Sequence, residues 1–403
     1  MATPTFSAAQ RAILDQEYPR FSDAEIRRRR DEFDETMARH EVDHLVVHGI
    51  GGRGGAVGWL AQWLVTNEAH LVVSPGERDA LFVQYFNHVP LAQHLARDAE
   101  VSWGGPSTIL TTIAELHSRG AQARRVGVMG PLPLAYVRAL EKEFGPVVDL
   151  SGAYARMRTI KSDEELTWFE LGARLGDLAI AALSEQVVPG VSERDLGAIV
   201  EGSYQKYGGV NGIHYFAVNA MDDPHYCVAR QHPSTRRVRG GDAITTEITA
   251  NFFDYGGQVL RTFVVDAVPN ALFAKLHDAA DAAFAAISSL LVPGTHASEL
   301  VAASAIIEER GFTTFDDLVH GYGGGYLSPV LGSSSRTHEP IADFVLAQNM
   351  MLVVQPNVVT TDHRAGVQTG ECLVVTKEGA RALHRAPRGL LHVGANRQSR
   401  TDS

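Results

Sequence analysis

Between residues 241 and 262, polar and apolar residues alternate with a period of two, which predicts two β-strands joined by a polar turn at 251–257. One face of the first strand carries Thr245, Glu247 and Thr249. One face of the second strand carries Gln258, Leu260 and Thr262. Bending the strands about the turn can bring the Glu247 carboxylate beside the Gln258 amide. Such groups are costly to bury unless something pairs with them, so the hairpin is a candidate site, with a solvated Glu247 as the alternative.

The first part of the chain alternates between apolar and amphipathic segments, which predicts an α/β domain at 1–155. The first helix is predicted at 22–40, because Ser22 and Glu25 have the spacing of a capping box. Further helices are predicted at 108–118 and 135–143, and strands at 42–48, 71–73, 80–86 and 126–128. The glycine-rich segment 49–58 lacks the Lys-Ser/Thr of a phosphate-binding loop, which favours a flexible loop that presents Arg53.

The remaining residues, 156–403, contain runs of strands interrupted by pairs of helices. Ser162 and Glu165 form a second capping box, which starts a long helix that ends near residue 186. Other helices are predicted at 193–206, 272–291 and 298–309, and late strands at 351–354 and 372–375. The chain as a whole therefore predicts an α+β protein in which a smaller α/β domain precedes a larger domain.

Charge and cysteine content narrow the range of partners. A net charge of −11 gives no support to a nucleic-acid partner, and the one basic run, at 27–30, is followed at once by acidic residues. Two cysteines, Cys227 and Cys372, cannot form a disulfide framework, which favours a reducing cytoplasm. No apolar run reaches the ~18 residues that a membrane span needs. These features predict a cytoplasmic protein without membrane or nucleic-acid partners.

Polar residues of unusual type gather in several segments of the larger domain. They include Asn219 and Pro224 before His225 and Tyr226, Arg261 after Gln258, His320 and Tyr322 among glycines, and then His338, Gln355 and Glu371. In this order the segments resemble the pita-bread fold of creatinase, prolidase, aminopeptidase P and methionine aminopeptidase, over nearly the whole chain. The resemblance implies a small-molecule substrate and a homodimer in which the partner's first domain closes the cavity.

The metal-dependent members of this family hold two divalent ions with two Asp, one His and two Glu. The resemblance places those positions on Glu247, Gln258, His320, Gln355 and Gly370, with Glu371 one residue beyond the last. Amides thus stand where two of the carboxylates are expected, and hard cations prefer charged oxygen ligands. The sequence therefore predicts no two-ion centre and no cofactor, with a single ion held by Glu247, His320 and Glu371 as the open alternative.

The histidines of the family pattern are better preserved than its metal ligands. His225 resembles the family histidine that contacts the substrate and moves protons, and His338 resembles a second substrate-side histidine whose pattern is altered here. His232 is close enough in sequence to replace His225. Because an imidazole titrates near neutral pH, the main hypothesis is a metal-independent, creatinase-like enzyme in which a histidine acid/base cleaves a C–N or similar bond of a small polar metabolite, by hydrolysis or elimination.

The candidate residues fall into two groups. The predicted catalytic residues are His225, Glu247, His320 and His338. The residues predicted to bind the substrate or shape its pocket are Gln258, Gln355, Glu371, Arg261, Tyr226 and Tyr322. For Arg261 the alternative is a structural pair with a nearby carboxylate, and for the two tyrosines it is simple packing.

Two other functions remain open from the sequence. One is a metal-dependent Xaa-Pro-type aminopeptidase or dipeptidase with an altered site for a single ion. The other is a non-catalytic pita-bread protein that acts as a binding or scaffold module.

Overall fold

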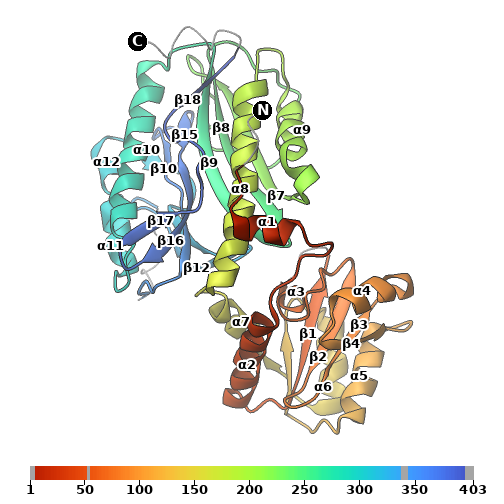
Figure 1. Cartoon of the computed structure of the whole chain (residues 1–403). Helices are drawn as coiled ribbons and strands as arrows, with labels where there is room; N and C mark the ends of the chain where they lie inside the picture. Colours follow the sequence, from red (N-terminus) through yellow and green to blue (C-terminus); the bar gives the residue numbers. More distant parts are fainter. Residues whose placement is uncertain (1–4, 52–54, 337–343, 395–403) are drawn as a thin grey trace. The chain divides into compact units, whose positions relative to one another are not determined.

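The computed structural model describes residues 5–51, 55–336 and 344–394 (Figure 1). The chain divides into two compact units, one formed by Ala12–Arg158 and the other by Met1–Arg11 together with Thr159–Ser403. The predicted domains, 1–155 and 156–403, stay a prediction, and the units differ from them because the segment up to Arg11 groups with the C-terminal part. Within the described ranges, no helix is both long enough and apolar enough to cross a membrane.

The N-terminal unit is built on a six-stranded sheet with the strand order β4-β3-β2-β1-β5-β6. Its strands are β1 His44–Ile50, β2 Glu68–Val73, β3 Asp79–Val83, β4 Ala99–Trp103, β5 Val126–Met129 and β6 Val148–Asp149. Its helices are α2 Asp23–Arg39, α3 Gly55–Ala61, α4 Val89–Leu95, α5 Thr108–Ser118, α6 Leu134–Phe144 and α7 Ser151–Met157. A short helix, α1 Ala8–Leu14, comes before them.

Successive side chains of β1 enter two different cores, because neighbouring residues of a strand point to opposite faces. Leu45 and Val47 pack in a core with residues of α2 and α3. Val46 packs in a second core with residues of α5 and α6. The same alternation places His48 on the face that α5 and α6 cover.

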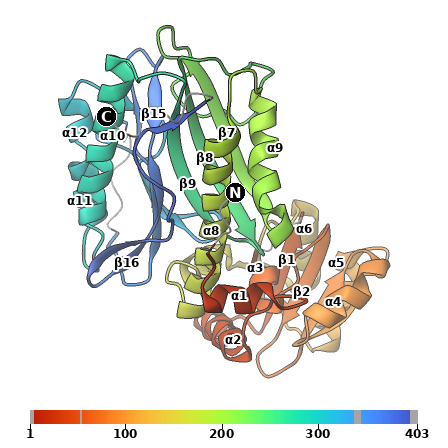
Figure 2. The same cartoon turned by 45° about the horizontal axis from the view of Figure 1, so that its top comes forward.

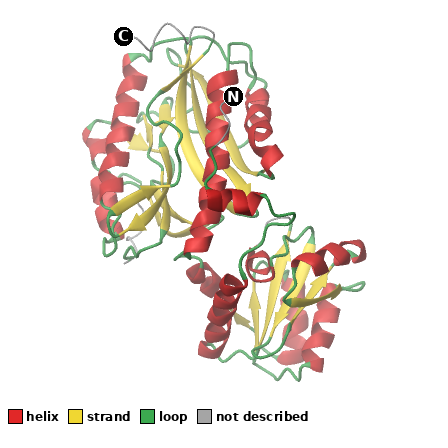
Figure 3. Ribbon diagram, in the orientation of Figure 1, coloured by secondary structure: helices red, strands yellow, loops and turns green. Residues whose placement is uncertain are grey.

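The C-terminal unit contains a large sheet with the strand order β12-β11-β13-β16-β9-β8-β7, to which β17 and β18 add, and a small sheet β10-β14-β15. Its strands are β7 Val210–Ala220, β8 Asp242–Phe252, β9 Tyr255–Val265, β10 Thr313–Thr314, β11 Val319–Tyr322, β12 Tyr326–Leu331, β13 Met351–Val354, β14 Asn357–Val359, β15 Gly366–Gln368, β16 Gly370–Thr376, β17 Gly379–Ala382 and β18 Leu391–Val393. Its helices are α8 Asp163–Gln186, α9 Glu193–Tyr204, α10 Ala271–Ser289, α11 Ala297–Ala303 and α12 Ile306–Glu309. Figure 3 shows the strands between these helices.

The long helix α8 lies against β8 and β9, as both views of the unit show (Figures 1 and 2). It begins with the predicted capping box, in which Ser162 accepts from the Glu165 N–H and the Glu165 side chain accepts from the Ser162 N–H. The helix approaches the sheet closely at Gly172, where an added Cβ would lie 2.2 Å from the Tyr255 carbonyl oxygen. Glycine at this position therefore sets the distance between α8 and the central hairpin.

Overpacking against backbone costs about 1–3 kcal/mol, and a 2.2 Å contact belongs at the upper end of that range. Since alanine recovers ~1 kcal/mol through helix propensity, we expect Gly172→Ala to destabilise the protein by about 1–2 kcal/mol. The matched control is Gly202→Ala in α9, where an added Cβ meets nothing within 4 Å. Urea unfolding should show a lower free energy of unfolding for Gly172→Ala and a slightly higher one for Gly202→Ala. Equal behaviour of the two variants would contradict the close approach of α8.

The predicted turn of the central hairpin is too long. β8 continues to Phe252 and β9 begins at Tyr255, so that only Phe253 and Asp254 form the turn. Both have positive φ, 48° and 67°, which is the backbone of a two-residue type I′ turn. Such turns usually contain Asn or Gly, and the absence of those residues here is why the sequence pattern placed the turn over a wider segment.

Two further predictions need correction. The segment predicted as a loop at 49–58 ends in helix α3, and Arg53 lies outside the described residues. The single helix predicted at 298–309 is broken into α11 and α12 around Ser304, whose side chain donates to the Val301 carbonyl. The two predicted helix starts are confirmed, since Ser22 caps α2 by accepting from the Glu25 N–H and Ser162 caps α8.

Candidate active site

The polar side chains predicted to meet on the central hairpin do meet. Thr249 lies opposite Gln258 in the β8–β9 pair, which places Gln258 diagonally beside Glu247 on the same face. Nε2 of Gln258 donates to Oε1 of Glu247 at 2.7 Å and to Oε1 of Gln355 at 3.0 Å. All three side chains are buried. The sheet therefore encloses a polar network around a single carboxyl group.

Gln355 directly follows β13 and is held on the side of β11. Its backbone N–H donates to the Leu318 carbonyl at 2.9 Å, and its Nε2 donates to the Asp317 carbonyl at 3.2 Å. Because Nε2 is directed to Asp317, Oε1 of Gln355 faces Gln258. Gln258 in turn uses Nε2 for both of its contacts, which leaves its own Oε1 as an acceptor.

Glu247 is the titratable centre of this network. Burial raises its pKa to about 8, and repulsion from Asp316 acts in the same direction. The nearby Gln368 side chain lowers the pKa by less than these effects raise it. Most Glu247 side chains are therefore protonated at pH 7, and the group changes its charge in the range where enzymes work.

His320, on β11, is fully buried beside the network. Its ring stacks on Tyr326 with centroids 3.7 Å apart and planes 11° from parallel. Nδ1 lies 2.9 Å from the Gly321 carbonyl and donates to it, so Nε2 carries the lone pair. Burial lowers the pKa of His320, and Nε2 has no hydrogen-bond partner among the described residues. Tyr322, two residues on, is buried with its ring centroid 6.2 Å away.

Arg261 and Glu371 are engaged with each other and with backbone. Nη2 of Arg261 donates to Oε2 of Glu371 at 2.6 Å, and both side chains are buried. The other donors of Arg261 reach four carbonyl oxygens, those of Leu260, Gly370, Ala386 and Pro387. The contacts of this pair are structural, so its role in substrate binding stays a prediction.

The predicted acid/base His225 lies on an exposed loop. Its side chain is 62% exposed, and Nε2 is 3.3 Å from the carboxylate of Asp223. Asn219 shapes this loop, because its Oδ1 accepts from the N–H groups of His225 and Tyr226 at 3.0 and 3.1 Å. Tyr226 is 40% exposed and stacks under Arg230. The sequence spacing of Asn219 and His225 thus has a structural reason.

The structure brings only some of the predicted site residues together. The hydrogen-bonded network contains Glu247, Gln258 and Gln355, and His320 is buried beside Gln355. No hydrogen bond among the described residues links His225 to that network, and His232 is exposed as well. His338 lies outside the described residues. The catalytic roles of the three histidines at 225, 320 and 338 therefore stay predictions.

Sequence reasoning missed two residues that act on the site. Asp316 repels the charge of Glu247, and burial raises the pKa of Asp316 itself. Tyr326 stacks on His320, and partial burial, together with the nearby carboxylates of Asp316 and Glu247, raises the pKa of Tyr326. The signal for Asp316 was the acidic pair Asp316-Asp317 directly before the strand that carries His320. Tyr326 gave no signal, because its stacking depends on how β12 folds back on β11.

The side chains present here do not fit a two-ion metal centre. Gln258 and Gln355 are neutral and are hydrogen-bonded to each other, and Glu371 is neutralised by Arg261. The alternative trio for one ion, Glu247, His320 and Glu371, does not bring its ligand atoms together either. Among the described residues, one set of three such atoms lies within 4.8 Å, and it belongs to the N-terminal unit.

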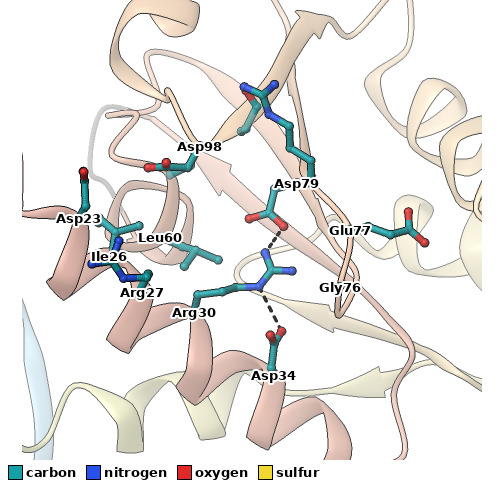
Figure 4. A pocket seen from close by; sticks show the side chains of 13 residues that line it. Asp23, Ile26, Arg27, Arg30, Asp34, Leu60, Gly76, Glu77, Asp79 and Asp98 are labelled. Carbon is teal, nitrogen blue, oxygen red and sulfur yellow. Dashed lines mark hydrogen bonds and ion pairs between the residues drawn. The ribbon is translucent and has the colours of Figure 1, made fainter.

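A pocket of about 420 Å³ lies in the N-terminal unit, between α2 and the segments around β3 (Figure 4). Three of its charged side chains are paired with one another. Arg30 contacts the carboxylate of Asp79 and that of Asp34, the latter at 3.1 Å. We assign this pocket no role in the chemistry.

Comparison with known proteins places these features in a family. The sequence model of "Metallopeptidase family M24" matches residues 169–377. The chain is similar to the Xaa-Pro dipeptidase of Pyrococcus horikoshii, with 26% identity over 66% of this chain and 75% of that protein. It is also similar to an uncharacterized hydrolase/peptidase of Sinorhizobium fredii, with 27% identity over 93% of this chain and 97% of that protein.

Solved structures support the fold. A structure titled Xaa-Pro dipeptidase from Bacillus anthracis superposes with a TM-score of 0.78, covers 91% of this chain and 100% of its own, and is 19% identical. An Xaa-Pro aminopeptidase structure from Thermotoga maritima gives a TM-score of 0.79 over 90% of this chain and 99% of its own, at 17% identity. The predicted fold, a pita-bread domain after a smaller α/β domain, is confirmed.

The main functional hypothesis is wrong. The named relatives are Xaa-Pro dipeptidases and other peptidases, which contradicts a creatinase-like enzyme. The expectation of a protein without metal loses support as well, because the described residues include a candidate metal-ligating trio. The hypothesis gave the lost carboxylates more weight than the overall likeness to peptidases. A change of ligand residues alters a site without identifying the bond that is cleaved.

Proposed function

Because the chain belongs to metallopeptidase family M24, we propose that it is a hydrolase that cleaves small peptides of the Xaa-Pro type at the network of Glu247, Gln258 and Gln355. The observation that carries this proposal is the state of Glu247. It is a buried carboxyl group whose pKa is raised to about 8, and it is held in place by an oriented amide. Groups with such pKa values are poised for acid/base chemistry at neutral pH.

The network suits the amino end of a short peptide. Gln258 Oε1 and His320 Nε2 are both acceptors, and ionised Glu247 adds a negative charge. A free ammonium group has three donors and a positive charge, so it complements these three groups. A peptide with a free amino end is favoured over a neutral or anionic metabolite for this reason.

Glu247 has a defined place in the hydrolysis. In its ionised form it takes a proton from a water molecule, whose oxygen forms a bond to the carbonyl carbon of the peptide. The same proton then passes to the leaving nitrogen as the C–N bond breaks, which returns Glu247 to its ionised form. Gln258 fixes the carboxyl group by its 2.7 Å hydrogen bond, so that the orientation of Oε2 is set before substrate binds.

The proposal is tested with dipeptides. Purified protein is incubated with several Xaa-Pro dipeptides, matched Xaa-Ala dipeptides and creatine, each with and without added Mn²⁺, Co²⁺ or Zn²⁺. We expect release of free proline from Xaa-Pro dipeptides, at rates at least tenfold above those for creatine. Cleavage of creatine alone, or no cleavage of any dipeptide with any ion, would contradict the proposal.

The homodimer that the resemblance implies also belongs to this proposal, as does a cytoplasmic location. The likeness to whole peptidase chains supports a shared mode of assembly. Light scattering on the purified protein should give the mass of two chains. If the mass stays that of one chain at high protein concentration, no partner domain contributes to the site.

A further inference from the structure

Three ligand-type side chains meet inside the N-terminal unit, on the face of the sheet covered by α5 and α6. His48 on β1 lies directly opposite His70 on β2 in the antiparallel pair. Glu68 stands two residues before His70 on β2, so it shares the same face. One ligand atom from each side chain lies within 4.8 Å of the others. We call His48, Glu68 and His70 the β1–β2 trio.

The trio is buried, and three of its ring nitrogens lack partners. His48 is 1% exposed, His70 is 0% exposed and Glu68 is 9% exposed. Both ring nitrogens of His48 and Nε2 of His70 have no hydrogen-bond partner within the described residues. Unpaired polar atoms in an apolar core cost free energy. An ion that binds one nitrogen of each ring would remove most of that cost.

The surrounding helices orient the trio. Thr112 on α5 donates its hydroxyl hydrogen to the Thr108 carbonyl at 2.8 Å, so its oxygen accepts from Nδ1 of His70 at 2.7 Å. Nε2 of His70 therefore carries the lone pair and faces the trio. Tyr136 on α6 donates to Oε2 of Glu68 at 3.0 Å. Supporting hydrogen bonds of this kind are typical of the residues behind metal ligands.

We propose that the β1–β2 trio binds a Zn²⁺ ion through Nε2 of His70, one ring nitrogen of His48 and a carboxylate oxygen of Glu68. Two neutral imidazoles and one carboxylate are a ligand set that Zn²⁺ accepts, with a fourth position left for water. Every ligand comes from residues before 169, where the family match begins.

The bound ion would tie β1 to β2 and, through Thr112 and Tyr136, to the helices on that face. Its role is therefore to stabilise the N-terminal unit, in whose core the trio is buried. The inference does not depend on the proposed peptidase activity. Ion binding and unfolding are its readouts, so either proposal can fail without the other.

The test measures ion binding by the full chain. The protein is treated with a chelator and then titrated with Co²⁺, whose visible bands report low-symmetry coordination, and with Zn²⁺, whose content is measured by mass spectrometry. We expect about one Zn²⁺ per chain. His48→Gln and His70→Gln should weaken binding by more than the ~10–100-fold that loss of a supporting residue causes. Tyr136→Phe, which keeps the ring, should weaken it within that range.

Two controls decide between the trio and other sites. His44→Gln changes another buried histidine of β1, which contacts Ser74 at 2.8 Å and lies outside the trio, and it should keep the bound ion. Glu247→Gln should also keep it. If the histidine variants fail to fold, Tyr136→Phe still gives the answer. Absence of bound Zn²⁺, or equal binding by the wild type and Tyr136→Phe, would overturn the proposal.

Discussion

Replacing Glu247 with glutamine is expected to lower kcat/KM for an Xaa-Pro dipeptide by about 10²–10⁴-fold, the range for loss of a general acid/base. The substitution keeps the shape of the side chain, and its amide oxygen can still accept from Gln258 Nε2 at the present 2.7 Å. The loss would therefore come from the missing proton transfer and not from a collapsed site. Steady-state kinetics with the best dipeptide of the panel measures it.

The matched control for this variant is Glu378→Gln, which alters an exposed carboxylate in the turn before β17. It should leave kcat/KM unchanged. A Glu247→Gln enzyme with wild-type kinetics would remove Glu247 from the chemistry, whatever the substrate. A rise in KM with unchanged kcat would indicate that Glu247 binds the ammonium group without moving protons.

The pH dependence of the same variant gives a second readout. Since Glu247 acts in its ionised form, kcat/KM should rise as pH passes through about 8, and the glutamine variant should lack this rise. Stability should change in the opposite direction. The pKa of Glu247 in the folded state lies above the ordinary value of 4.5. Between pH 4.5 and about 8, Glu247 is therefore protonated in the folded state and ionised in the unfolded state. Its contribution to stability is present below pH 4.5 and is lost as pH rises through 8.

As pH rises from about 5 to 8, the free energy of unfolding of the wild type should therefore fall relative to that of Glu247→Gln, by an amount on the order of a few kcal/mol. Urea unfolding of both proteins at several pH values checks this. A constant difference between them across that range would show that the pKa of Glu247 is not raised. It would also remove the main support for its acid/base role.

The sequence could predict the parts of the site that depend on one hairpin. Alternation with a period of two is enough to place Glu247 and Gln258 on one face, and their hydrogen bond follows from a diagonal pairing across adjacent strands. Gln355 could be placed near them only through the family resemblance. The acidic pair Asp316-Asp317 marks the segment before the His320 strand, but its effect on Glu247 depends on how that loop packs beside the network, which the pair alone does not reveal.

The same limit explains why the β1–β2 trio was missed. The strand predicted at 71–73 stopped short of Glu68 and His70, which belong to β2, so the face that they share was not recognised. His48 and His70 become neighbours only through the register of the pair. A register is fixed by packing on both faces of the sheet, and the sequence of one strand does not contain it.

The second prediction with a large expected effect concerns the ion pair of Arg261 and Glu371. Arg261→Met keeps much of the side-chain volume but leaves the Glu371 carboxylate buried without its partner, 3% exposed. Breaking a buried pair from one side costs about 3–5 kcal/mol. We expect a loss of that size in urea unfolding. The double variant Arg261→Met/Glu371→Gln should recover part of it, because the remaining amide is neutral.

Arg381→Met is the control for this loss, because Arg381 pairs with Glu170 at the surface, where the two side chains are 44% and 30% exposed. Exposed pairs contribute about 0–1 kcal/mol, so this variant should change stability little. The pair of Arg261 joins β9 to β16 beside the candidate site, whereas the pair of Arg381 joins β17 to α8. Equal losses in the two variants would show that burial does not set the strength of the Arg261 pair. Arg261 would then be free to act on the substrate, as the sequence first suggested.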